Sequence, residues 1–221
     1  QSGVIDTSTD SIYNFEAFSK GLFSSKDVLS ITSSKLNKNI LYISTRSGLI
    51  YEYNGKFKAI FKLPVSTNHQ VQCQRDDKGN YWITYETNKI LKVNSQQQII
   101  DSFQIQKRGH DIKKIIRTNP NLIIESQFAS QERAYWTISN NKLIPLKPGE
   151  NKSTQIVHIT DQHLFFSKND TLYRRPVNQL ENSNNDLVIC SIPNFYYHHS
   201  LIDKQGLLWI TTSNGIKKLV T

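Results

Sequence analysis

Seven residues of the 221-residue sequence carry side chains suited to ligand recognition, and they lie in three short segments. Histidine and arginine offer N–H donors, and tyrosine offers an aromatic face with a hydroxyl group at its tip. Such groups bind the hydroxyls and rings of a sugar, or the carboxylates of an acidic ligand. The predicted ligand-binding residues are His69, Arg108, His110, Tyr196, Tyr197, His198 and His199.

None of these residues forms a recognisable catalytic or metal-binding pattern, so we expect no enzyme, no cofactor and no metal site. His198 and His199 are adjacent. Adjacent residues of a strand point to opposite faces, so only one of the two could join a metal-binding cluster. No serine or cysteine lies in a nucleophile elbow. A carboxylate such as Asp111 could serve a lyase or glycosidase, which is the third functional interpretation.

The two cysteines, Cys73 and Cys190, lie far apart in the sequence. A zinc ribbon requires closely spaced pairs of ligands, so this spacing excludes that kind of site. Each cysteine lies in an apolar or alternating segment, where a thiol packs as a small hydrophobic group. We favour two buried strand thiols, and a single disulfide remains open as the alternative.

The charge and the hydropathy of the chain limit its partners. No apolar run approaches the roughly eighteen residues of a spanning helix, so we expect no membrane segment in this chain. The net charge of +9 suits an acidic partner. The basic residues are scattered in short pairs such as Lys113-Lys114 and Lys217-Lys218, and no nucleic-acid-binding motif accompanies them. We therefore expect no nucleic-acid partner.

The elements that must position these side chains come from a repeat. The segment Leu41–Leu49 reappears at Tyr81–Ile90 and at Leu208–Ile216, each with the order aromatic, Ile, Ser or Thr. Tyr42 and Trp82 are 40 residues apart, and Trp82 and Trp209 are 127 apart, which is three periods of about 42. Two diverged repeats, at Asn121–Glu125 and His163–Ser167, occupy the positions between them.

Each repeat is predicted to form four short antiparallel strands. In the second repeat, an inner strand at Val71–Arg75 runs into the turn Asp76–Asn80, where Asp and Gly suit a tight hairpin. The strand with the aromatic residue follows, then a third strand, and then an outer strand at Gln97–Phe103. No segment has helical periodicity with caps, so little or no helix is expected. A period of about 42 residues with four strands indicates an all-β fold, a β-propeller of about five four-stranded blades.

The ends of the sequence predict how such a ring would close. The last repeat ends after its third strand, Ile216–Val220, whereas Ile12–Phe18 is an additional strand-like segment before the first repeat. We expect this N-terminal strand to close the last blade, because closure removes an exposed sheet edge. The whole chain, residues 1–221, is then a single domain. The alternative is a fragment of a larger, seven-bladed propeller.

The repeat resembles the two-component regulator propeller repeat of the periplasmic sensors of hybrid histidine kinases. The likeness rests on an Asp-x-x-Gly turn, a following Trp-Ile-Thr strand and a Gly-Ile pair after that strand. All three are present in Asp203–Ile216. Phe15–Leu22 resembles the lead-in of such repeats. The sequence departs from the pattern at Asn88-Lys89, which replaces Gly-Leu. No kinase, receiver or helix-turn-helix segment accompanies the repeats.

The resemblance implies an extracytoplasmic sensor domain, periplasmic or extracellular, that binds an oligosaccharide or another small ligand and acts with a parent sensor kinase. Propeller loops that enter the innermost strands open on one face, where a rigid scaffold presents binding residues. The seven ligand-binding candidates lie in or near these loops. The alternative function is a protein–protein interaction propeller, which an exposed aromatic patch made from Tyr51, Tyr53, Phe57 and Phe61 would favour.

Overall fold

The computed structural model describes an all-β chain. Its backbone is described for residues 3–6, 11–14, 19–24, 26–34, 36–37, 39–64, 69–117, 121–128, 133–146, 155–160, 162–180, 183–192, 197–212 and 215–220. The side chains of residues 3–6, 11–14, 117, 133, 139, 155, 183 and 197–199 lie outside this description. No helix within the described ranges has the length and apolar character needed to cross a membrane.

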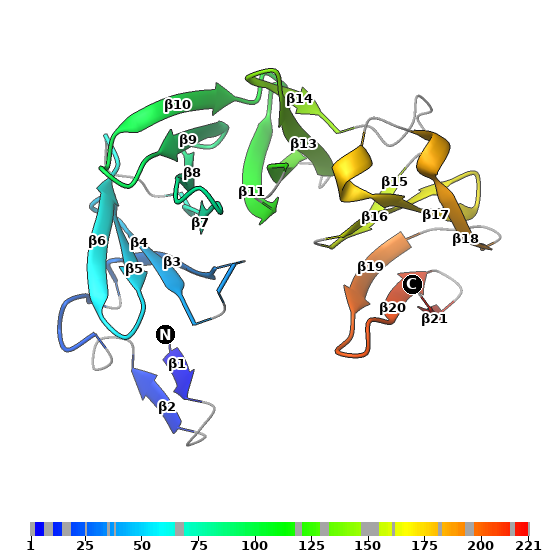
Figure 1. Ribbon diagram of the computed structural model, residues 1–221. Helices are drawn as coiled ribbons and strands as arrows, with labels where there is room; N and C mark the ends of the chain where they lie inside the picture. Colours follow the sequence, from blue (N-terminus) through cyan, green and yellow to red (C-terminus); the bar gives the residue numbers. More distant parts are fainter. Residues whose placement is uncertain are drawn as a thin grey trace. The chain divides into compact units, whose positions relative to one another are not determined.

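The chain divides into two compact units, residues 1–144 and 145–221, and each is considered by itself. The first unit contains three four-stranded antiparallel sheets, whose strands lie side by side in Figure 1. The first sheet consists of β3 (Val28–Ser33), β4 (Leu41–Thr45), β5 (Leu49–Tyr53) and β6 (Phe57–Lys62). The second consists of β7 (Cys73–Arg75), β8 (Tyr81–Tyr85), β9 (Lys89–Val93) and β10 (Ile99–Gln104). The third consists of β11 (His110–Arg117), β12 (Ile123–Phe128), β13 (Arg133–Ser139) and β14 (Lys142–Pro145).

The second unit contains two antiparallel sheets, which we call the fourth and the last sheet. The fourth sheet consists of β15 (Gln155–Ile159), β16 (His163–Lys168), β17 (Thr171–Pro176) and β18 (Leu187–Ser191). The last sheet has three strands, β19 (Tyr197–Ile202), β20 (Leu208–Thr212) and β21 (Gly215–Leu219). Two short 3-10 helices, η1 (Val177–Gln179) and η2 (Ser183–Asn185), are the only helical segments among the described residues. The predicted all-β class and, for the described residues, the near absence of helix are therefore confirmed. The inner and outer strands predicted for the second repeat, Val71–Arg75 and Gln97–Phe103, lie within two residues of β7 and β10.

The first residues of the chain form a separate hairpin. β1 (Gly3–Asp6) pairs with β2 (Ser11–Asn14) in a two-stranded antiparallel sheet. The segment predicted to close the last blade, Ile12–Phe18, therefore pairs with β1 in its described part, while residues 15–18 lie outside the described residues. Closure of the last blade by this segment, and the single-domain organisation, remain predictions.

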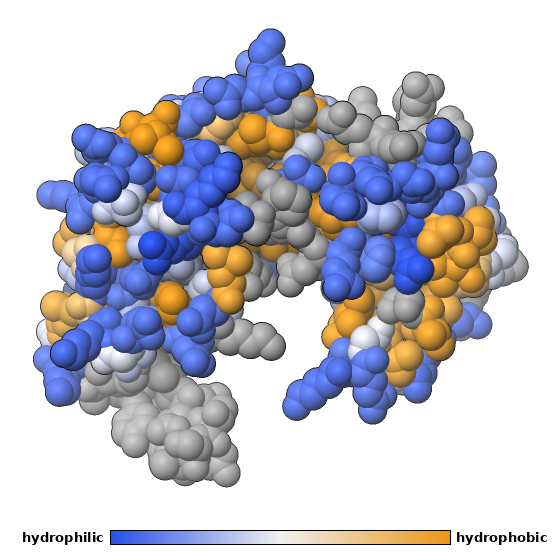
Figure 2. Space-filling view, viewed as in Figure 1, coloured by the Kyte–Doolittle hydropathy of each residue, from blue (hydrophilic) through white to orange (hydrophobic). Residues whose placement is uncertain are grey.

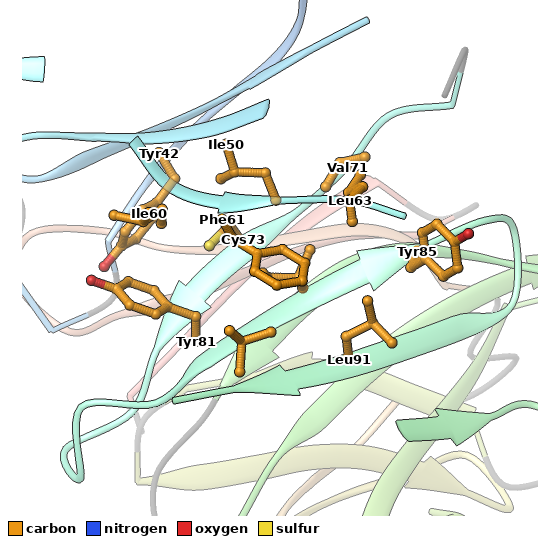
Figure 3. Close-up of a cluster of buried hydrophobic side chains, with 12 residues drawn as sticks. Tyr42, Ile50, Ile60, Phe61, Leu63, Val71, Cys73, Tyr81, Tyr85 and Leu91 are labelled. Atoms are coloured by element: carbon orange, nitrogen blue, oxygen red, sulfur yellow. The ribbon is translucent and has the colours of Figure 1, made fainter. Parts of the chain in front are cut away.

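The first and second sheets of unit 1 pack face to face around a buried apolar cluster. Figure 3 shows that its side chains come from both sheets and point toward one another. The cluster consists of Tyr42, Ile50, Ile60, Phe61, Leu63, Val71, Cys73, Tyr81, Ile83, Tyr85, Leu91 and Val93. Side chains of the inner strands add hydrogen bonds between the two sheets: Thr32 donates to the Cys73 carbonyl (3.3 Å), and Gln74 donates to the Ser33 carbonyl (2.9 Å). Because successive side chains of a strand point to opposite faces, each sheet can pack one face against each of its two neighbouring sheets.

The two cysteines are free thiols. Cys73 lies in the cluster between the first two sheets, and Cys190 is half-buried in β18. Burial raises the pKa of both thiols, because a thiolate loses hydration in an apolar interior. The prediction of two strand thiols is confirmed, with Cys190 less buried than expected.

Candidate functional site

The structure describes three of the seven predicted ligand-binding side chains. His69 and Arg108 are exposed, whereas His110 is buried, with 2% of its surface accessible. Tyr196 lies outside the described residues. Tyr197, His198 and His199 belong to β19, but their side chains lie outside the description. The predicted ligand site therefore remains a prediction, and among its three described side chains the buried His110 is the least accessible to a ligand.

His110 takes part in a buried hydrogen-bonded cluster of the third sheet. Its Nδ1 atom lies 3.2 Å from Ser126 Oγ, which also accepts a hydrogen bond from Trp136 Nε1 (2.7 Å). The Phe128 ring lies beside the imidazole, and a Cβ atom at Gly109 would lie 2.3 Å from that ring. Gly109 also has a φ of +77°, which favours glycine. The segment that the sequence suggested as a ligand loop is thus packed tightly where it enters β11.

A second serine–histidine pair lies in unit 2. His158 Nδ1 lies 2.8 Å from Ser200 Oγ, and Ser200 Oγ donates to the Val157 carbonyl at 2.7 Å. A nucleophilic serine has to reach a substrate with a hydroxyl group that its base can deprotonate. Ser126 is completely buried, and the Ser200 hydroxyl is already bonded to backbone. Both pairs are better explained as links within and between sheets.

A three-residue arrangement in the second sheet joins a turn to two strands. Asp76 begins the turn and accepts hydrogen bonds from the Asn80 backbone N–H (2.8 Å) and from Trp82 Nε1 (3.0 Å). Lys92 lies opposite Trp82 in the next strand, with its ammonium group 4.8 Å from the indole ring. The carboxylate fixes the indole edge and the ammonium covers one indole face, so this tryptophan is held in one orientation.

The last sheet repeats the arrangement with different residues. Asp203 accepts from the Leu207 backbone N–H (3.0 Å) and from Trp209 Nε1 (2.8 Å). Lys218 lies opposite Trp209, 5.3 Å from its ring. Sequence analysis identified the Asp turn and the tryptophan separately but not the bond between them. The signal was available, because Asp precedes Trp by six residues in both repeats.

The surroundings of the two arrangements differ. Trp82 and Ile90 of the second sheet are 6% and 0% exposed, because residues of the third sheet such as Ile115, Ile124 and Trp136 pack against them. At the corresponding positions of the last sheet, Trp209 is half-buried and Ile216 is 68% exposed. Leu201, which lies opposite Trp209 on β19, is 55% exposed. Figure 2 shows apolar side chains at the surface in the region of β18–β21.

We call the surface formed by Leu201, Trp209, Ile216 and Lys218 the open face of the last sheet. Register places these residues on one side, since Leu201 and Lys218 both lie opposite Trp209, and Ile216 lies opposite the next residue on that side, Thr211. The opposite side of the sheet is different: Leu208 and Ile210 are buried together with Val157, Phe165 and Leu172 of the fourth sheet. Among the described residues, the last sheet is therefore covered on one side and open on the other.

Known proteins match this chain in structure. No protein-family model matches it, and no curated protein sequence matches it. The structure of Hsv2 from Kluyveromyces lactis is similar, with a TM-score of 0.55 and 11% identity over 88% of this chain and 59% of the Hsv2 chain. Hsv2 from Kluyveromyces marxianus is similar as well, with a TM-score of 0.54 and 10% identity over 88% of this chain and 62% of that chain. The WD40 β-propeller domain of Doa1 has a TM-score of 0.48 and 13% identity over 89% of this chain and 66% of that chain.

These likenesses concern the fold alone, because identity is low. The chain spans about three fifths of the length of the Hsv2 chains. The described residues form five antiparallel sheets of three or four strands each, and the structural neighbours are β-propeller proteins. The structural comparison therefore supports the all-β fold of propeller type expected from the repeat, while the number of blades stays a prediction.

Proposed function

We propose that this chain is a protein-binding propeller module with five blades, and that a protein partner docks on the open face of the last sheet. The observation that carries the proposal is the 68% exposure of Ile216, whose counterpart Ile90 is completely buried by a neighbouring sheet. An apolar sheet face that is covered in one repeat and uncovered in another is suited to contact with a further protein surface.

The chemistry of the open face fits a protein better than a sugar or a metal. Leu201 and Ile216 offer aliphatic surface, and Trp209 offers an indole whose N–H is already bonded to Asp203. Tryptophan held in a fixed orientation loses little side-chain entropy on binding, which is why it is enriched among the residues that dominate binding energies. Lys218 places a positive charge at the same face, in keeping with the net charge of +9.

The sensor function and the oligosaccharide ligand remain predictions from the resemblance. His69 and Arg108 are the exposed members of the predicted ligand set among the described side chains. Among the described side chains, the two serine–histidine pairs are explained by their bonds to neighbouring groups. Asp111, the carboxylate considered for a lyase or glycosidase, lies 3.4 Å from the Lys113 ammonium group. We therefore favour the protein-interaction function over both.

The test is affinity capture from an extract of the source organism, with identification and purified re-binding of each retained protein. The wild-type chain is compared with the double variant Leu201→Lys/Ile216→Lys, and with Ile99→Lys/Ile100→Lys as a control. Ile99 and Ile100 are aliphatic residues of β10 with 46% and 49% exposure, so this control adds the same two charges outside the open face. Thermal unfolding verifies that each variant is folded.

We expect a protein that binds the wild type and the Ile99→Lys/Ile100→Lys chain directly, and that loses at least tenfold in affinity for the Leu201→Lys/Ile216→Lys variant. Equal affinity of every retained protein for a folded double variant would refute the open face as the binding surface.

A further inference from the structure

Two asparagines occupy corresponding places in neighbouring sheets of unit 1, but their side chains have different surroundings. Asn54 directly follows β5 and begins the turn to β6, and Asn94 directly follows β9 and begins the turn to β10 (Figure 1). Each donates its backbone N–H across its turn, Asn54 to the Lys56 carbonyl (3.2 Å) and Asn94 to the Gln98 carbonyl (3.0 Å). The two turns therefore place an asparagine at the same point of the hairpin.

The Asn94 side chain is held by three hydrogen bonds. Its Oδ1 atom accepts from the backbone N–H groups of Gln96 (3.0 Å) and Gln98 (2.9 Å), and its Nδ2 atom donates to Gln98 Oε1 (2.9 Å). Both polar atoms of the carboxamide are thus bonded, and the residue is half-buried. The Asn94 carboxamide is therefore fixed in one orientation.

The Asn54 side chain is exposed and makes no hydrogen bond with the described residues. Gly55 follows it with a φ of +73°, and a Cβ atom at Gly55 would meet no heavy atom within 4 Å. Within the described part of the chain, the Gly55 backbone N–H makes no backbone hydrogen bond either. This peptide bond is therefore open on the side of the Asn54 carboxamide. The other Asn-Gly pair of the sequence, Asn214-Gly215, has its asparagine outside the described residues.

A rotating asparagine carboxamide beside a glycine N–H is suited to deamidation, the reaction behind the chemical lability of asparagine. The backbone nitrogen of Gly55 forms a bond to Cγ of Asn54, the Cγ–Nδ2 bond breaks, and ammonia leaves with the proton of the Gly55 N–H. Water then cleaves either carbonyl–nitrogen bond of the cyclic imide, which yields aspartate or isoaspartate. The attack requires the carboxamide to turn toward the following nitrogen, and a carboxamide bonded at both polar atoms is held away from that orientation.

We propose that Asn54 is a chemical modification site of the folded protein, where the Asn54-Gly55 peptide loses ammonia and becomes aspartate or isoaspartate, while Asn94 is protected by its hydrogen bonds. Water is the only co-reactant. The inference is independent of the protein-binding function proposed above.

The modification changes the hairpin that carries Asn54. Either product adds a negative charge beside the exposed Lys56 and Lys58. Isoaspartate also adds a methylene group to the main chain directly after Tyr53, whose ring centroid lies 4.8 Å from that of Phe57 across the turn. The reaction therefore alters both the charge and the length of the connection between β5 and β6.

The test is incubation of the folded full chain in mildly alkaline buffer, followed by peptide mapping with mass spectrometry. The mapping measures the fraction of amide converted to acid at each asparagine, and electron-transfer fragmentation distinguishes isoaspartate from aspartate. The matched control is a Ser95→Gly chain, which gives Asn94 a glycine neighbour while Asn94 keeps its bonds to Gln96 and Gln98. Both chains are also incubated in denaturing urea, and circular dichroism verifies which samples are folded.

We expect Asn54 to convert at least tenfold faster than Asn94 in the folded wild type, and at least tenfold faster than Asn94 in the folded Ser95→Gly chain. In urea, Asn94 of the Ser95→Gly chain should react nearly as fast as Asn54, because the protecting hydrogen bonds are lost. An unmodified Asn54 in the folded chain would overturn the proposal. Equal rates at Asn54 and at Asn94 of the folded Ser95→Gly chain would overturn it as well, because the neighbouring glycine alone would then explain the reaction.

Discussion

The second sheet and the last sheet carry the same turn, tryptophan and lysine, but they do so in different surroundings. In the second sheet, Trp82 and Ile90 are buried against the third sheet. In the last sheet, the corresponding Trp209 is half-buried and Ile216 is exposed. The comparison separates two roles of one motif: the bond from Asp to the indole orders the hairpin locally, whereas stabilisation by burial depends on a second sheet.

The largest difference in stability between the two sheets is expected when lysine replaces Ile90 in the second sheet and Ile216 in the last sheet. Ile90→Lys places an unpaired charge in a closed apolar cluster and should cost about 4–5 kcal/mol or more, enough to prevent folding of unit 1. Ile216→Lys should change the free energy of unfolding by about 0.5 kcal/mol or less. Urea unfolding of both variants, followed by circular dichroism, measures the difference. Equal destabilisation would mean that Ile216 is covered in solution.

Replacement of each tryptophan by alanine should give a smaller difference in the same direction. Trp82→Ala leaves a cavity between the second and third sheets and should cost about 3–5 kcal/mol. Trp209→Ala removes a half-buried ring and one hydrogen bond and should cost about 1–2 kcal/mol. Urea denaturation measures the free energy of unfolding of each variant, provided that its slope against urea concentration is unchanged. A larger loss of stability for Trp209→Ala than for Trp82→Ala would contradict the comparison.

The two lysines should contribute least to stability. Lys92→Ala removes an ammonium group 4.8 Å from the Trp82 ring and should cost about 1 kcal/mol. Lys218→Ala should have a smaller effect, because solvent screens the more exposed pair. A double-mutant cycle that combines each Lys→Ala change with Trp→Phe measures the coupling energy of the Lys92–Trp82 and Lys218–Trp209 pairs. A larger coupling energy for the Lys218–Trp209 pair would contradict this expectation.

Protonation of the Asp203 carboxylate at low pH should weaken its hydrogen bond with the Trp209 indole N–H. The hydrogen bond from Trp209, followed by the bond from the Leu207 backbone, holds the pKa of Asp203 below its ordinary value of 3.8. A pKa lowered on folding means that this carboxylate stabilises the hairpin above its unfolded pKa, and that the stabilisation is lost as pH falls through the folded pKa.

NMR of the indole N–H resonances tests this pH dependence. The Trp209 signal should shift with a midpoint below pH 3.8, and Asp203→Asn should abolish the shift. A midpoint at or above the ordinary value would show that the indole bond does not favour the carboxylate.

Much of the fold could be predicted from the sequence because its signals are local. The aromatic and β-branched residues of Tyr81–Tyr85 and the Asp and Gly of the turn before it specify a hairpin without reference to distant residues. The same unit at Leu208–Thr212 follows from the same reasoning. The diverged repeats at β12 and β16 were located by the period alone, and both strands lie where the period placed them.

The candidate site could be predicted only in part. His110 has the residue type and position of a ligand-binding residue, and its burial depends on Ser126 and Phe128, which belong to another strand. Trp82 packs against the third sheet, whereas Trp209, at the same position of its repeat, is half-buried. Nothing in the sequence near either tryptophan reveals whether a further sheet lies against it.

The sequence by itself determined the strands, the turns, the period of the blades and the identity of the Asp, Trp and Lys positions, since these depend on residues a few places apart. Only the tertiary structure decided which copy of the motif is buried and which is open. The physical reason is that burial is a property of two surfaces: Ile90 and Ile216 have the same local sequence role, but only Ile90 has a sheet packed against it among the described residues.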